Sequence, residues 1–240
     1  MSDHTVKAFD DDLNRLRGLV SEMGARAVLS ISQAMTALDQ RDATSAQDII
    51  AGDRVIDELE NEIEKLVVQT IALRAPMADD LRTMVAALKI AAVLERVGDY
   101  GKNIAKRVPM LVSQRSIEAI PLLISMAEIA CDMMREVLEA YAAQDAQRAI
   151  EVCRRDKMVD DFYNAIFRAL ITYMMEQPRS ISESAHLLFV AKNLERVGDH
   201  ATNIAEMVYY AATGQHMDQR EKGSGSFDRF EPRTDRQVQG

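Results

Sequence analysis

The feature that most constrains this chain is a stretch of eleven residues that occurs twice, one hundred positions apart. Residues 95–105 read Glu-Arg-Val-Gly-Asp-Tyr-Gly-Lys-Asn-Ile-Ala and residues 195–205 read Glu-Arg-Val-Gly-Asp-His-Ala-Thr-Asn-Ile-Ala, so eight of the eleven positions are identical. Residues four apart share one side of an α-helix, because each residue advances the helix by about 100°. The repeat therefore predicts two helices, each with a ridge of oxygen-bearing side chains.

Both copies keep the acids, the arginine and the glycine of this ridge. The first ridge contains Glu95, Asp99 and Asn103, and the second contains Glu195, Asp199 and Asn203. A single Glu-x-x-x-Asp pair is more often an ordinary solvated face, but its duplication favours a function. A glycine inside a helix costs roughly 1 kcal/mol relative to alanine and usually marks the close approach of a backbone or a ligand. Gly98 and Gly198 therefore predict a close neighbour at each ridge.

The composition is typical of a helical protein with a substantial core. Hydrophobic residues make up 48% of the 240 positions, and the chain has ten glycines, five prolines and no tryptophan. A formal net charge of −9, without a basic stripe, argues against a nucleic-acid partner. Cations or basic protein surfaces match this charge better.

The cysteines and the amino terminus indicate the compartment. Cys131 and Cys153 lie in apolar helical contexts without metal-binding or redox spacing, which predicts buried thiols in a reducing compartment. The first residues lack the pattern of a secretory signal, and no apolar run reaches the about 18 residues that span a membrane. We therefore expect a cytoplasmic protein whose contact with a membrane is indirect.

Apolar residues at three- and four-residue spacing predict six long helices in two similar sets of three. The expected helices cover residues 5–38, 46–73, 77–108, 116–141, 145–175 and 180–212. Pro76 and Pro178 interrupt the pattern before the ridge helix of each half, because proline lacks a backbone N–H. The sequence thus predicts an all-α protein of two tandem three-helix bundles, at 1–110 and 111–213, and a disordered tail at 214–240.

The middle helices of the two halves also match, at an offset of 103 residues. Asp53 and Asp57 in the first half correspond to Asp156 and Asp160 in the second. In an up-down-up bundle with short connections, the middle helix packs antiparallel against the third. We therefore expect each acidic pair to face the ridge of its own half, which places four carboxylates in one patch.

Four carboxylates held close together raise one another's pKa unless cations balance their charge. Metal ions would balance it, and so would Arg54, Arg96 and Arg196, which leaves a plain salt-bridge network as an alternative. Oxygen ligands suit Mg²⁺, Mn²⁺ or ferric iron, and Zn²⁺ less well. His200 could add a nitrogen ligand in the second half, although a lone histidine beside a ligand more often lies on the neighbouring face.

The acids are not accompanied by the pattern of a catalytic site. A ferritin-like di-iron oxidase needs two Glu-x-x-His motifs, and only Glu183 and His186 form one. The sequence has no nucleophile motif, phosphate-binding glycine loop or dinucleotide fingerprint. We therefore expect a protein that is not an enzyme, with a metal-dependent hydrolase or oxidase and a purely structural helical scaffold as alternatives.

The chain resembles the PhoU family of phosphate-signalling regulators over residues 5–212. The resemblance is carried by the doubled Glu-Arg-Val-Gly-Asp-x-x-x-Asn-Ile-Ala run, by residues 74–82 (Arg-Ala-Pro-Met-Ala-Asp-Asp-Leu-Arg) and by the paired Asp-x-x-x-Asp helices. It implies two similar three-helix bundles with multinuclear metal clusters, held by paired Glu/Asp-x-x-x-Asp motifs. The corresponding residues are Asp53, Asp57, Glu95 and Asp99 for one site and Asp156, Asp160, Glu195 and Asp199 for the other, with Asn103 and Asn203 as supporting ligands.

The resemblance also implies a cytoplasmic negative regulator of the phosphate-starvation response. Such a protein acts between the ATPase subunit of a phosphate ABC transporter and a membrane sensor histidine kinase, and it restrains the kinase when phosphate is plentiful. We further expect a homodimer, because exposed apolar positions on the first helices would permit one. The tail from residue 214 lies outside the resemblance.

Overall fold

The computed structural model describes residues 2–111 and 119–218, and in these two ranges all regular structure is helical. The helices are α1 (Ser2–Gln40), α2 (Ala43–Gly52), α3 (Arg54–Arg74), α4 (Ala78–Ala105), α5 (Val108–Leu111), α6 (Ile120–Ala143), α7 (Ala146–Glu176), the short 3₁₀-helix η1 (Pro178–Ser180) and α8 (Ile181–Thr213). This confirms the all-α prediction. Among the described helices, none is long and apolar enough to cross a membrane.

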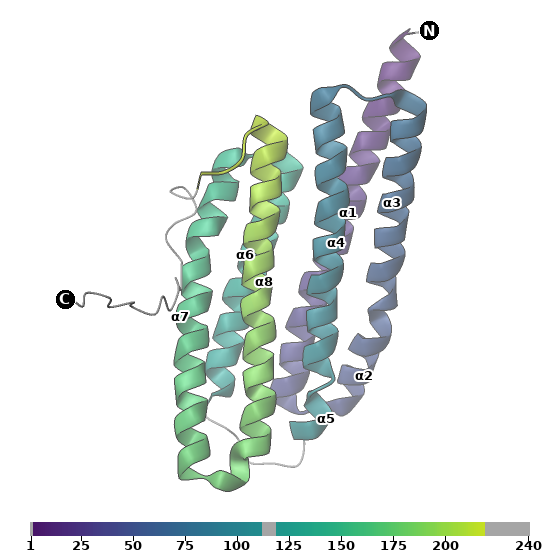
Figure 1. Cartoon of the computed structure of the whole chain (residues 1–240). Coiled ribbons are helices and arrows are strands. Elements are labelled where there is room, and N and C mark those ends of the chain that lie inside the picture. The colour runs from purple at the N-terminus through teal and green to yellow at the C-terminus, as the bar shows by residue number, and fades with distance from the viewer. Residues whose placement is uncertain (1, 112–118, 219–240) are drawn as a thin grey trace, which may run out of the picture.

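The helices form two bundles that lie side by side (Figure 1). In the first bundle α1, α4 and the α2–α3 pair pack together, and in the second α6, α7 and α8 do. Helices α1 and α4 also contact α6 and α8, so these four helices meet at the centre of the molecule. The two ridge helices, α4 and α8, are therefore neighbours, whereas α3 and α7 lie on the outer sides (Figure 1).

One apolar core runs through both bundles. Its largest fully buried side chains include Leu16, Met23, Ile31, Ile90, Leu94, Leu123, Met126 and Met133. Cys131 and Cys153 are both buried, as predicted. Met217 is also buried, with its sulfur 3.8 Å from Cys153 Sγ. The packed structure therefore continues beyond the predicted limit at residue 213, and the part of the predicted tail at 219–240 lies outside the described residues.

The middle helix of the first half differs from the prediction of one helix over 46–73. It is broken between α2, which ends at Gly52, and α3, which begins at Arg54, whereas α7 is continuous. Glycine is the least favourable residue after proline in a helix interior, and the corresponding position in α7 is Arg155. The break places Asp53 at a turn, where its side chain is only 6% exposed.

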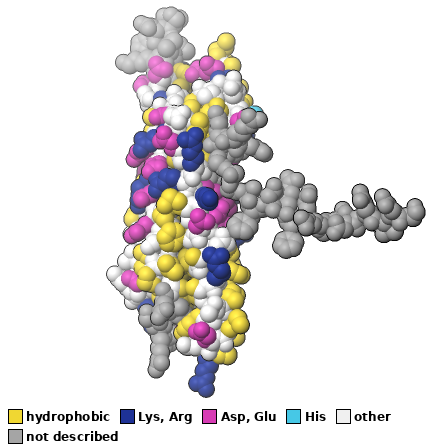
Figure 2. Space-filling model, turned by 90° about the vertical axis from the view of Figure 1, so that its left-hand side faces the viewer, with side chains coloured by type: hydrophobic (Ala, Val, Ile, Leu, Met, Phe, Trp, Pro, Cys, Tyr) yellow, Lys and Arg dark blue, Asp and Glu magenta, His cyan; other side chains and the backbone are white. Residues whose placement is uncertain are grey.

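Some apolar side chains remain exposed near the turns of the hairpins α3–α4 and α7–α8. Leu73 and Met77, which flank the α3–α4 turn, are 78% and 79% exposed, and Met175 near the end of α7 is 78% exposed. Figure 2 views the molecule from the side of α6 and α7 and shows hydrophobic side chains gathered over the lower part of that face.

Gly101 sets the spacing between α1 and α4. A Cβ added at this position would lie 2.3 Å from Ser30 Oγ and 3.0 Å from the Ser30 carbonyl carbon. Gly101→Ala should therefore force the helices apart and lower the free energy of unfolding by about 1–3 kcal/mol, measured by urea denaturation. Gly18→Ala in α1 is the control, because no atom lies within 4 Å of the added Cβ. Equal losses in both variants would contradict this account.

Candidate functional site

The middle helix approaches the ridge helix of its own half at the repeated glycine. A Cβ added at Gly98 would lie 3.6 Å from Asp53 Oδ1, and one added at Gly198 would lie 3.0 Å from Asp156 Oδ1. The predicted close neighbour at each glycine is therefore confirmed. Because no side chain fills this space, the two aspartates lie against the backbones of α4 and α8.

The first acidic cluster consists of Asp53, Asp57, Glu95 and Asp99. Burial, followed by the negative charges of Asp99, Glu60, Asp57 and Asp53, raises the pKa of Glu95 above its ordinary value. The acids of α4 and of the α2–α3 pair thus share one patch, as the sequence predicts. Glu60 belongs to the same patch, although the sequence analysis did not single it out.

Lys102 lies inside the first acidic cluster. Its Nζ donates to Asp53 Oδ2 at 2.5 Å and to Asp99 Oδ1 at 3.2 Å. These two hydrogen bonds, opposed in part by burial, hold the pKa of Lys102 above its ordinary value. The lysine therefore links the break after Gly52 to the ridge helix and balances part of the negative charge.

The second acidic cluster consists of Asp156, Asp160, Glu195 and Asp199. Burial, followed by the charges of Asp160, Asp199 and Glu195, raises the pKa of Asp156 to about 7. Partial burial, followed by the charge of Glu195, also raises the pKa values of Asp160 and Asp199. The acids of α7 and α8 therefore face one another as predicted, and their charge is less well balanced than in the first cluster.

Lys192 is the nearest cation of the second cluster. Its Nζ donates to Glu195 Oε1 at 2.6 Å and lies 2.5 Å from Oε2. The ammonium thus pairs with both oxygens of this carboxylate. The sequence analysis missed both lysines because they are not repeated: residue 202 is threonine and residue 92 is alanine.

The arginines considered as counter-ions have other roles. Arg54 pairs at 3.0 Å with the exposed Glu58 one helical turn away. Burial, followed by the charges of Arg96 and Arg196, lowers the pKa of His200, which places both arginines near that ring. Arg196 affects the pKa of Asp199 less than Lys192 does.

The two bundles meet where the repeats differ. The Tyr100 hydroxyl lies 3.0 Å from His200 Nε2, and the two rings stack with their centroids 5.5 Å apart. His200 thus lies on the face next to the acids and contacts the other bundle. Asn203 Nδ2 lies 3.4 Å from His200 Nδ1, and Asn103 is half-buried on α4. Support of the clusters by these two asparagines stays a prediction.

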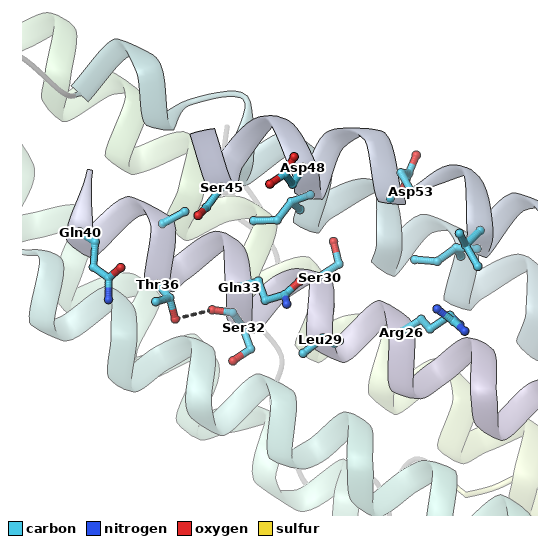
Figure 3. Close-up of a pocket in the computed structure, with 15 residues that line it drawn as sticks. Arg26, Leu29, Ser30, Ser32, Gln33, Thr36, Gln40, Ser45, Asp48 and Asp53 are labelled. Carbon is cyan, nitrogen blue, oxygen red and sulfur yellow. Dashed lines mark hydrogen bonds between the residues drawn. The ribbon is translucent and has the colours of Figure 1, made fainter. Parts of the chain in front are cut away.

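A pocket of about 430 Å³ opens beside the first cluster, between α1 and the α2–α3 pair (Figure 3). Gly52 and Asp53, at the break, line it together with Ser30 of α1. Figure 3 shows Ser30 pointing from α1 toward the α2–α3 segment. Its Oγ is buried and has no hydrogen-bond partner within the described structure. The pocket therefore leads from solvent to polar groups next to Asp53.

The donors of both clusters suit a hard cation, but they are not gathered into a coordination sphere. Oxygen donors come from two helices in each cluster, and several pKa values are raised. Across residues 2–111 and 119–218, no three His, Cys, Asp or Glu side chains converge closely enough to hold a metal ion. In the first cluster, the Lys102 ammonium lies between two of the acids.

Comparisons with a family model, with known sequences and with solved structures all point to the same family. A family model described as the PhoU domain matches residues 20–108 and 123–208, one match in each bundle. The chain is 52% identical over 220 residues to the phosphate-specific transport system accessory protein PhoU homolog of Zymomonas mobilis subsp. mobilis, covering 92% of this chain and 93% of that protein.

Two crystal structures have the same fold. The phosphate transport system regulatory protein PhoU from Streptococcus pneumoniae has a TM-score of 0.82 and 30% identity, and the alignment covers 88% of this chain and 99% of that one. PhoU from Pseudomonas aeruginosa has a TM-score of 0.74 and 33% identity, with coverage of 90% and 100%. The similarity thus extends over both bundles.

The raised pKa of Asp156 predicts a pH-dependent stability in protein freed of metal by chelation. The folded state holds this proton up to about pH 7, whereas the unfolded state releases it near the ordinary pKa of 3.8. The free energy of unfolding therefore falls as the pH rises between these values. Asp156→Asn removes the ionisation and should raise the free energy of unfolding at pH 8 by about 1–2 kcal/mol, because the partly solvated group retains only part of the full effect. Urea denaturation should find no gain near pH 4.

Glu151→Gln is the control for this experiment, because it neutralises an exposed acid of the same helix outside the cluster. Its stability should follow that of the unmodified protein at both pH values. A gain for Asp156→Asn that is the same at pH 4 and pH 8 would contradict the electrostatic explanation.

Proposed function

This chain belongs to the PhoU family, and from that premise we propose that it is an accessory protein of a phosphate-specific transport system. Members of the family are accessory and regulatory proteins, and the chain is a regulator rather than an enzyme. The observation that carries the proposal is the doubled acidic ridge on two similar bundles, each of which matches the PhoU domain separately.

The finer proposal is a cytoplasmic negative regulator of the phosphate-starvation response. It would dock on the ATPase subunit of a phosphate ABC transporter and on a sensor histidine kinase, and it would hold the kinase inactive when phosphate is plentiful. The net charge of −9 and the acidic clusters support docking to basic protein surfaces. The exposed apolar side chains near the α3–α4 and α7–α8 turns support a homodimer.

We further propose that each acidic cluster binds hard cations, such as Mg²⁺, Mn²⁺, iron or, less favourably, Zn²⁺. Asp53, Asp57, Glu95 and Asp99 would bind them in the first bundle, and Asp156, Asp160, Glu195 and Asp199 in the second. The meeting of four carboxylates across two helices, with raised pKa values, supports the proposal. A bound cation would balance this charge, and it would join the two helices that supply the oxygens.

Deletion of the gene tests the regulatory proposal directly. Transcription from a phosphate-response promoter should rise in phosphate-rich medium, because the kinase would no longer be restrained. A promoter-fusion reporter measures this, and the intact gene supplied on a plasmid should restore low output. Reporter output that is unchanged by the deletion would argue against negative regulation.

Substitution of ridge acids tests the cation sites. Glu95→Gln combined with Asp99→Asn should lower the metal content of the purified protein by about half, because one of two clusters loses its ligands. Elemental analysis by mass spectrometry gives the metal content, and circular dichroism checks the helical fold. Glu58→Gln combined with Glu62→Gln is the matched control, since it removes two exposed acids four residues apart on α3. Complete loss of metal would mean that the clusters are coupled, and unmodified protein without metal would favour a plain scaffold.

A further inference from the structure

Two lysines make the otherwise similar clusters chemically different. Lys102 of α4 corresponds in the repeat to Thr202 of α8, and Lys192 of α8 corresponds to Ala92 of α4. Each half therefore brings a single lysine to its acids, but from opposite ends of the repeated motif. The two lysines consequently contact different members of the acidic set.

Lys102 bridges the two helices that form the first cluster. Its Nζ binds Asp53 Oδ2 on one side and Asp99 Oδ1 on the other, at 2.5 and 3.2 Å. Asp53 is 6% exposed, so the lysine supplies the charge that compensates a buried carboxylate. The ammonium occupies one oxygen of each carboxylate, and its positive charge repels a metal ion that approaches the remaining oxygens.

Lys192 forms an ion pair with only one of the four acids of the second cluster. It pairs with Glu195, three residues away on the same helix, and on α7 its Nζ faces the ring of Tyr163, 5.4 Å from the centroid, rather than an acid. Within the described ranges, no ion pair reaches the carboxylates of Asp156, Asp160 or Asp199. Oxygens from both helices of this cluster are therefore free of a bridging lysine.

We propose that Lys102 is an internal counter-cation that competes with metal ions for the first acidic cluster, so that the two clusters bind cations with different affinities. The inference rests on the cation binding proposed above. A metal ion must either displace the Lys102 ammonium from Asp53 and Asp99 or bind beside its positive charge, and the first cluster is therefore the weaker site. The pocket between α1 and the α2–α3 pair gives an ion access to the Asp53 side of this cluster (Figure 3).

Titration with Mn²⁺ alone tests the competition. The full chain is stripped of metal by chelation, and bound Mn²⁺ is followed by the loss of the electron paramagnetic resonance signal of the free ion. The unmodified chain should have one tight and one weaker class of site. Lys102→Thr, which introduces the residue found at position 202, should tighten the weaker class about tenfold or more. Lys106→Thr is the matched control, an exposed lysine one turn further along the chain that should change neither class.

Stability with and without Mn²⁺ separates competition from a purely structural role of Lys102. Without metal, Lys102→Thr leaves Asp53 buried and unpaired and should lower the urea midpoint of unfolding. Saturating Mn²⁺ should restore the midpoint at least to that of the unmodified protein, whereas a purely structural ion pair would leave the variant weakened in both conditions.

The possible failures are distinguishable. An unmodified chain that binds no Mn²⁺ would overturn the proposed cation sites and the competition with them. A chain that binds Mn²⁺ with two affinities, both unchanged by Lys102→Thr, would overturn the competition alone and leave the cation sites in place.

Discussion

The rest of the structure depends on one contact in each half. There the middle helix packs closely against a glycine of the ridge helix, where the ridge helix has no side chain. Asp53 lies beside Gly98 and Asp156 beside Gly198, in space that a Cβ would reach. A side chain at Gly98 would meet Ile56 Cδ1 at 2.7 Å and one at Gly198 would meet Asp156 Oδ1 at 3.0 Å, so either would push the middle helix away from the ridge acids. The glycines therefore lower the intrinsic stability of the helix, but they allow carboxylates from two helices to share one patch.

Bringing the acids together creates a charge problem that the two halves solve differently. In the first cluster, Lys102 joins Asp53 to Asp99 across two helices. In the second, Lys192 pairs with Glu195 on its own helix, and burial, followed by the charges of the neighbouring acids, raises the pKa of Asp156 to about 7. The two clusters have the same types of acid, three aspartates and one glutamate, but their negative charge is balanced to different degrees.

The contact between the bundles lies directly beside both clusters. Tyr100 follows Asp99 in the chain and His200 follows Asp199, and the two rings stack where α4 and α8 meet. A shift of either ridge helix at its cluster would therefore act on the packing between the bundles. This arrangement gives a regulator a direct structural connection from its charged sites to the relative position of its two halves.

The sequence by itself determined the helical class, the division into two similar bundles, and the meeting of Asp53 and Asp156 with their ridges, because these follow from local periodicity and from a repeat that copies both packing faces. It did not determine the break after Gly52, the pocket beside it, the roles of Lys102 and Lys192, or the contact of Tyr100 with His200. Long lysine side chains reach across a helix boundary to acids that are distant in sequence, and the neighbour of a ring depends on how the bundles pack. Only the tertiary structure decides such contacts, because they depend on distances between helices rather than on spacing along one helix.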